Sequence, residues 1–104
     1  MTEINITRNH TELRITLGTT LSAAEVPELQ AALKREIDAG ARELVFDLHQ
    51  TTALDSTGIG LLVAVSNSMA AVEGQQRLIH VSDDLFKLLR SMRLVDRLQA
   101  TTAA

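Results

Sequence analysis

Residues Leu44 to Gly60 read LVFDLHQTTALDSTGIG and give the clearest indication of the fold. This stretch overlaps the apolar, β-rich run 43–48, which is typical of a strand in the middle of a sheet. A polar loop over 49–55 follows, and we expect a helix from 57 to about 73, ended by Gly74. A buried strand that leads through a loop into a helix is the repeating unit of an α/β fold.

The start of that helix, Asp55-Ser56-Thr57-Gly58-Ile59-Gly60, is the part of the chain that suggests a particular chemistry. Ser56 occupies the position where a helix N-cap belongs. Two glycines in the first turn lower helix stability, by about 1 kcal/mol each when in an interior. They indicate backbone that turns sharply or is closely approached. One interpretation is that Ser56 only caps the helix and that the glycines allow close packing on the sheet.

A second interpretation is a phosphorylation switch at Ser56. A phosphate there would add about two negative charges beside Asp55. Free amides at the helix start would stabilise the phosphate within the folded protein. A partner packed on this surface would instead meet repulsion and bulk. The fold would therefore survive phosphorylation and the interface would not.

The residues before this stretch predict a hairpin and a helix. Alternating apolar and polar residues in 4–8 and 13–17 predict two half-buried strands joined by a tight turn. Ser22 and Glu25 have the spacing of a capping box, but Pro27 would then fall in the second turn and remove a backbone bond. The helix start is therefore left open by three or four residues. Its apolar side is formed by Val26, Leu29, Leu33 and Ile37.

The residues after this stretch predict a strand and a third helix. The strand covers 77–81, and Ser82 is expected to cap the helix that follows it. A short element at 94–98 and a frayed tail at 100–104 complete the chain. The order is β-β-α-β-α-β-α. It implies a single α/β domain, residues 1–104, with a mixed four- to five-stranded sheet and helices packed on it.

Composition excludes several classes of function. The chain has no cysteine, so it has no disulfide, thiol nucleophile or thiolate metal site. It has 13 acidic residues against 10 Lys and Arg and neither Tyr nor Trp, unlike the basic, aromatic surfaces that bind nucleic acid. The N-terminus lacks a signal-peptide pattern, and no apolar run reaches the roughly 18 residues of a membrane span. We expect a cytoplasmic protein that binds neither nucleic acid nor membrane.

The histidines and glycines do not support catalysis or cofactor binding. An enzyme would need Ser56 as nucleophile with His10, His49 or His80 as base, but there is no Gly-x-Ser-x-Gly elbow and no suitable histidine spacing. His80 is expected to be structural, and the other two to lie in loops. No spacing fits a metal site, and the two glycines at 58 and 60 lack the third glycine and the lysine of nucleotide loops. We expect no catalytic residue, metal or cofactor.

The helix after Ser56 has apolar residues on more than one side. One set can face the sheet, namely Ile59, Leu62, Val63, Met69 and Ala70. Leu61, Val65 and Val72 then point elsewhere. Such a helix is either buried by its neighbours or presents an apolar patch to a partner, and the pattern leaves both open. Around the third helix a solvated basic face is expected from Lys87, Arg90, Arg93 and Arg97.

The stretch from Leu44 to Gly60 resembles the signature of the STAS domain family, and specifically of the bacterial anti-sigma factor antagonists. In that family an apolar strand ending in Asp or Asn runs, after a loop, into Asp-Ser-Ser/Thr-Gly-Leu/Ile-Gly at a helix start. The order of elements and the length also match along essentially the whole chain. The resemblance implies an anti-sigma factor antagonist controlled by phosphorylation.

The resemblance implies a role for the residues of the motif. Ser56 corresponds to the serine that is phosphorylated by a partner which is both anti-sigma factor and serine kinase and which binds the ATP. The unphosphorylated antagonist binds this kinase and releases the sigma factor, and a PP2C-like phosphatase removes the phosphate. Contacts with the partner are then expected from Asp55, Thr57, Gly58, Ile59 and Gly60.

Ser22 departs from the family pattern. The family commonly has Gly-x-Leu-Asp between the second strand and the first helix, where this chain reads Thr-Thr-Leu-Ser over 19–22. An acid that would repel phosphate or orient a partner is missing, and Ser22 is included among the expected partner-binding residues. An alternative within the family is a STAS subunit of a lipid or anion transporter complex, which binds its partner without phosphorylation. The intact motif at Ser56 favours the switch.

Overall fold

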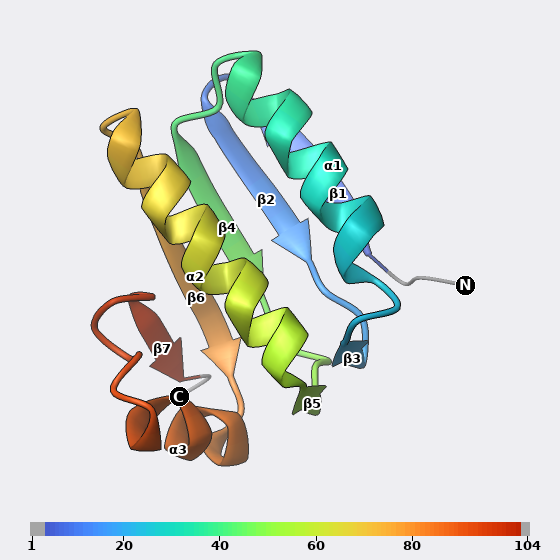
Figure 1. Ribbon diagram of the computed structural model, residues 1–104, viewed down its shortest axis with the longest axis vertical. Coiled ribbons are helices and arrows are strands. Elements are labelled where there is room, and N and C mark those ends of the chain that lie inside the picture. Colours follow the sequence, from blue (N-terminus) through green and yellow to red (C-terminus); the bar gives the residue numbers. More distant parts are fainter. Residues whose placement is uncertain (1–3, 103–104) are drawn as a thin grey trace.

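The computed structural model describes residues 4–102 and has a five-stranded sheet with two helices side by side on one face (Figure 1). In spatial order the strands are β1 (Asn5–Asn9), β2 (Glu12–Thr16), β4 (Glu43–Asp47), β6 (Gln75–Val81) and β7 (Ala100–Thr102). The helices are α1 (Val26–Asp38), α2 (Ser56–Ala71) and α3 (Asp83–Ser91). A separate parallel pair is formed by β3 (Thr20–Leu21) and β5 (Ala53–Leu54). The expected α/β fold is confirmed.

The strands pair as a hairpin followed by parallel crossovers. β1 is antiparallel to β2, as the alternating pattern predicts, and His10 in the turn has a φ of 58°. The pairs β2–β4, β4–β6 and β6–β7 are parallel. The chain between two parallel strands has to run back over one face of the sheet. These crossovers share one hand, and β2, β4 and β6 follow one another across the sheet, so α1 and α2 lie on the same face. As a result α1 and α2 run in the same direction over the strands (Figure 1).

The core lies between this helical layer and the sheet. It is formed by fully buried side chains from alternate positions of β2 and β4, together with Leu29 and Leu33 of α1 and Leu62 and Met69 of α2. β4 is buried from Leu44 to Asp47, as expected for a central strand. The fold therefore presents the two helix starts and the strand ends that precede them at one edge of the molecule.

The start of α1 resolves the conflict between the capping box and the proline. The helix begins at Val26, so Pro27 lies in the first turn, where a missing N–H costs nothing. Ser22 and Glu25 do pair, because the backbone N and the Oγ of Ser22 each donate to Oε1 of Glu25 at 3.0 Å. They form a turn that precedes the helix rather than its first turn.

The C-terminal prediction was wrong for residues 100–102. Instead of a frayed tail, these residues form β7, which pairs with β6. Leu98 and Ala100 are buried, and this anchors the strand at the edge of the sheet. The run Ala-Thr-Thr is too short and too small in side-chain size to show a strand pattern. Residues 103–104 of the predicted tail lie outside the described range.

Candidate functional site

The start of α2 is capped by Asp55 and not by Ser56. Asp55 has extended backbone angles (φ −94°, ψ 177°), and its Oδ1 accepts from the backbone N of Gly58 at 2.8 Å. The prediction that Ser56 is the N-cap was therefore wrong by one residue. Both residue types are good caps, and the backbone enters the helix at Ser56, so the aspartate takes the N3 amide.

Ser56 is thus left as the first residue of the helix with an exposed side chain. Its hydroxyl makes no hydrogen bond to any other residue in the described range. Thr57 follows at the next position and is also exposed. Because Asp55 caps the helix, the Ser56 hydroxyl is accessible to a reagent from solvent.

The two glycines of the motif serve different purposes. A Cβ on Gly58 would lie 2.3 Å from the carbonyl oxygen of Leu21, so only glycine allows α2 to approach β3 this closely. A Cβ on Gly60 would have no neighbour within 4 Å, and this residue is exposed. Close packing explains Gly58. Gly60 has no such role within the fold and leaves bare backbone on the surface near Ser56.

The predicted residues do not all lie on the surface. Ile59 is 6% exposed and packs in the interior. Ser22 is half-buried and its hydroxyl is engaged with Glu25. The next residue, Ala23, donates its backbone N–H to Oδ2 of Asp55 at 3.0 Å. The accessible residues of the predicted site are therefore Asp55, Ser56, Thr57 and Gly60, with the loop that contains Ser22 attached beside them.

The loop before Asp55 is held by side chains that bond to the β2–β3 connection. Gln50 donates to the carbonyl of Leu17 at 2.9 Å, and Thr51 to that of Gly18 at 2.8 Å. Thr52 continues the series to Thr19 at 3.2 Å. Together with the β3–β5 pair, these bonds hold the loops that lead into α1 and α2 against each other. The sequence did not predict this pair, because two-residue strands have no periodicity.

The charge at the site is negative and persistent. Hydrogen bonds from the backbone amides of Gly58 and Ala23 hold the pKa of Asp55 below its usual range. Asp55 is therefore ionised at neutral pH. Its bond to Gly58 also occupies one of the amides that we expected to be available for a phosphate on Ser56.

A second polar cluster, which sequence reasoning missed, surrounds Asp47 at the end of β4. Oδ1 of Asp47 lies 3.0 Å from Nδ1 of His80 and 3.1 Å from Nδ1 of His49, and Oδ2 lies 3.8 Å from Arg14. Burial acts to raise the pKa of Asp47, but hydrogen bonds from His80 and His49 outweigh it and leave the pKa lowered. His80 has a φ of 57° at an irregularity in β6. This cluster joins the ends of β4 and β6 and includes Arg14 from the middle of β2, in line with a structural role for His80.

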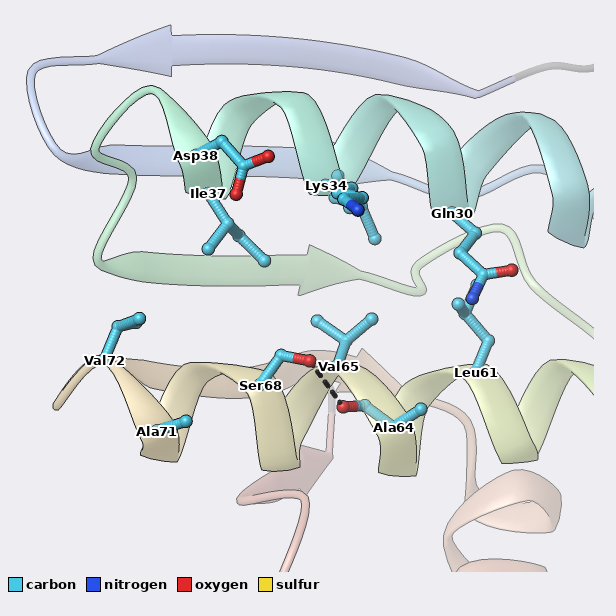
Figure 2. A pocket seen from close by; sticks show the side chains of 11 residues that line it. Gln30, Lys34, Ile37, Asp38, Leu61, Ala64, Val65, Ser68, Ala71 and Val72 are labelled. Atoms are coloured by element: carbon cyan, nitrogen blue, oxygen red, sulfur yellow. Dashed lines mark hydrogen bonds between the residues drawn. The ribbon is translucent and has the colours of Figure 1, made fainter.

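The apolar residues of α2 that were expected to point away from the sheet face α1. Leu61 and Val65 are 4% and 6% exposed, and Val72 is half-buried. With Leu33 and Ile37 of α1 they line a groove of about 420 Å³ between the two helices (Figure 2). The neighbouring helix thus explains the burial of Leu61 and Val65, and a shallow groove remains above them.

Two further findings concern cofactors and membranes. Within residues 4–102 no group of three or more His, Asp or Glu side chains is placed to hold a metal ion. In the same range no helix has the length and apolarity needed to span a bilayer.

Comparison with known proteins gives a consistent family. The family model described as "STAS domain" matches residues 3–103. An anti-sigma-B factor antagonist of Staphylococcus aureus is 28% identical over 82 residues, which are 79% of this chain and 76% of that protein.

Two solved structures share the fold. The anti-sigma factor antagonist SpoIIAA in its unphosphorylated form has a TM-score of 0.84 and 21% identity, over 95% of this chain and 88% of that chain. The Bacillus cell fate determinant SpoIIAA in the phosphorylated form has a TM-score of 0.78 and 21% identity, over 95% and 91%. Because the family model covers nearly the whole chain and the arrangement of strands and helices agrees, this protein belongs to the STAS domain family.

Proposed function

We propose that this protein is a cytoplasmic anti-sigma factor antagonist whose binding is switched off by phosphorylation of Ser56. The observation that carries the proposal is the exposed Ser56 hydroxyl at the start of α2, which has no hydrogen-bond partner among residues 4–102 because Asp55 caps the helix. The Staphylococcus aureus relative is an anti-sigma-B factor antagonist, and SpoIIAA has a phosphorylated form. Both facts support the proposal.

The partner is a protein that is both anti-sigma factor and serine kinase and that brings its own ATP. In the unphosphorylated state it packs on the surface made by Ser56, Thr57 and the bare backbone at Gly60, with Asp55 and the Ser22 loop at the rim. Binding of the kinase by the antagonist then releases the sigma factor. A PP2C-like phosphatase restores the binding-competent form.

The switch acts through charge and bulk at the interface. A phosphate on Ser56 places about two negative charges next to the ionised Asp55. The Gly58 amide is already bonded to Asp55, so this amide is not free to neutralise the added charge. The cost falls on a partner that has to desolvate the phosphate, whereas the exposed position spares the fold.

The test is incubation of the purified chain with the cognate kinase and ATP, followed by mass spectrometry of the intact protein and its peptides. We expect one phosphate on Ser56, none in Ser56→Ala, and unchanged modification in Thr57→Ala and in the control Ser82→Ala. Phosphorylated protein should bind the kinase at least about tenfold more weakly, a difference typical of losing complementarity at an interface.

Three results would count against the proposal. They are phosphate on another residue, equal affinity of the two forms for the kinase, and stable co-purification with membrane ATPase subunits without phosphorylation. The last would favour the transporter alternative. Ser56→Asp is a useful addition but imitates only part of the charge of a phosphate, so the phosphorylated protein decides.

A further inference from the structure

The groove between α1 and α2 has an apolar floor and two different rims. Its floor is made by Leu33, Ile37, Leu61, Val65 and Val72. On the α2 side the rim consists of the small residues Ala64, Ser68 and Ala71. Figure 2 shows Lys34 and Asp38 on the α1 side. One rim therefore allows close approach, and the other provides charge.

Lys34 and Asp38 are the charged side chains of this groove. Both are exposed, and neither forms an ion pair with another residue in the described range. α2 contains no charged residue from Ser56 to Ala71. Lys34 and Asp38 are one helical turn apart, about 6 Å along α1. A binding partner would find one positive and one negative site in a fixed order along the groove.

The direction of the helices decides which partner orientation fits. α1 and α2 run parallel, and both begin at the edge that holds Ser56 (Figure 1). A third helix laid in the groove is favoured electrostatically when it runs antiparallel to both, because its dipole then opposes theirs. In that orientation it passes Asp38 first and Lys34 one turn later.

We propose that this groove is a docking site for an amphipathic helix of a partner protein, bound antiparallel to α1 and α2. The helix carries Lys or Arg opposite Asp38, Glu or Asp four residues later opposite Lys34, and an apolar ridge that enters the groove. The small rim of α2 lets its backbone approach to the usual interaxial distance of about 8–10 Å. This surface is distinct from Ser56 and does not depend on phosphorylation.

The test uses two synthetic peptides of about 16 residues, long enough for four helical turns. Both have a Leu ridge and capped ends. One has Lys and then Glu four residues later, and the other has these two charges exchanged. We expect the first to bind the protein roughly fivefold more tightly, as two exposed charge pairs allow. Lys34→Glu combined with Asp38→Lys should reverse the preference. NMR shifts should map to the amides of Ala64, Ser68 and Ala71.

A matched pair of variants separates groove binding from general effects. Ala64→Trp places a large side chain at the groove and should abolish binding, with an unchanged circular dichroism spectrum. Ala70→Trp adds the same side chain at an exposed position of α2 that does not line the groove and should leave binding intact.

Four outcomes overturn the proposal. Equal affinity of the two peptides removes the charge argument, and shifts confined to the Ser56 edge place the contact elsewhere. Decanoate that shifts the groove amides when neither peptide does identifies a small amphiphile site. Self-association of the protein that is lost in the charge-reversed variant identifies a second copy of this chain as the occupant.

Discussion

Two helix starts in this molecule combine serine and aspartate in opposite order. α2 begins Asp55-Ser56, and the aspartate is the cap. α3 begins at Asp83, directly after Ser82. Here the serine is the cap, and its hydroxyl accepts from the backbone N of Leu85 at 3.3 Å. The Ser82 side chain is half-buried, whereas Ser56 is exposed. At both helix starts the residue directly after the cap is exposed, and only at α2 is that residue a serine.

This difference explains why a serine at a helix start is not by itself a regulatory site. A capping hydroxyl is occupied, and its modification would remove the cap. At α2 the cap and the accessible hydroxyl are separate residues, so a chemical change at Ser56 leaves the cap in place. Variants at the two helix starts test this difference.

Gly58→Ala should have the largest effect, because a Cβ there meets the Leu21 carbonyl at 2.3 Å. We expect a loss of about 3 kcal/mol in the free energy of unfolding, measured by urea denaturation. Gly60→Ala is the matched control, since nothing lies within 4 Å of its new methyl group. It should be neutral or stabilising by about 0.5 kcal/mol. Equal changes in the two variants would show that the close contact of Gly58 with β3 does not set the cost of the new methyl group.

Removal of the two caps should have a smaller and unequal effect. Ser82→Ala loses one bond and should cost about 1 kcal/mol. Asp55→Ala loses the bonds to both Gly58 and Ala23, so its denaturation midpoint should fall further. It should also speed hydrogen exchange at the Ala23 amide, which Ser82→Ala cannot do. An unchanged Ala23 amide would show that Asp55 does not hold the two loops together.

The smallest effect is the pH dependence of the two caps. The folded pKa of Asp55 is lowered from 3.8, so its contribution to stability is present above pH 3.8 and is lost as the pH falls through the lower folded value. A hydroxyl cap such as Ser82 does not titrate in this range. In an NMR titration the Gly58 amide should shift with a midpoint below 3.8, and Asp55→Asn should abolish this step. A midpoint at or above 3.8 would contradict the bonding described.

Much of the fold could be predicted from periodicity, and the exceptions have physical reasons. The hairpin, the three helices and the central strand have clear patterns of burial. β3, β5 and β7 are two or three residues long, so they depend on partners that local sequence does not reveal. The same limit affects the site. Asp55 and Ser56 stood out as a pair, but which of them caps α2 depends on where the backbone turns into the helix.

Tertiary contacts also decided which predicted residues are accessible. Gly58 and Ile59 belong to the motif but face inward, a consequence of their position in the first turn of α2. Residue 22 is not acidic, but the carboxylate of Glu25 lies within hydrogen-bond distance of Thr20 and Ser22 in the same loop. The spacing of Ser22 and Glu25 predicted their pairing, but the bond from Thr20 to Glu25 depends on how the loop folds before α1.

The pairing of β3 with β5 has a consequence for how Ser56 is recognised. The residues that shape this surface come from two parts of the chain, around Leu21 to Ala23 and around Asp55 to Gly60, joined through Asp55. A short peptide that spans Ser56 would contain only the second part, without the loop or a formed helix. Under the proposed switch, Ser56 therefore belongs to a discontinuous epitope, and we expect the kinase to phosphorylate it only in the folded protein.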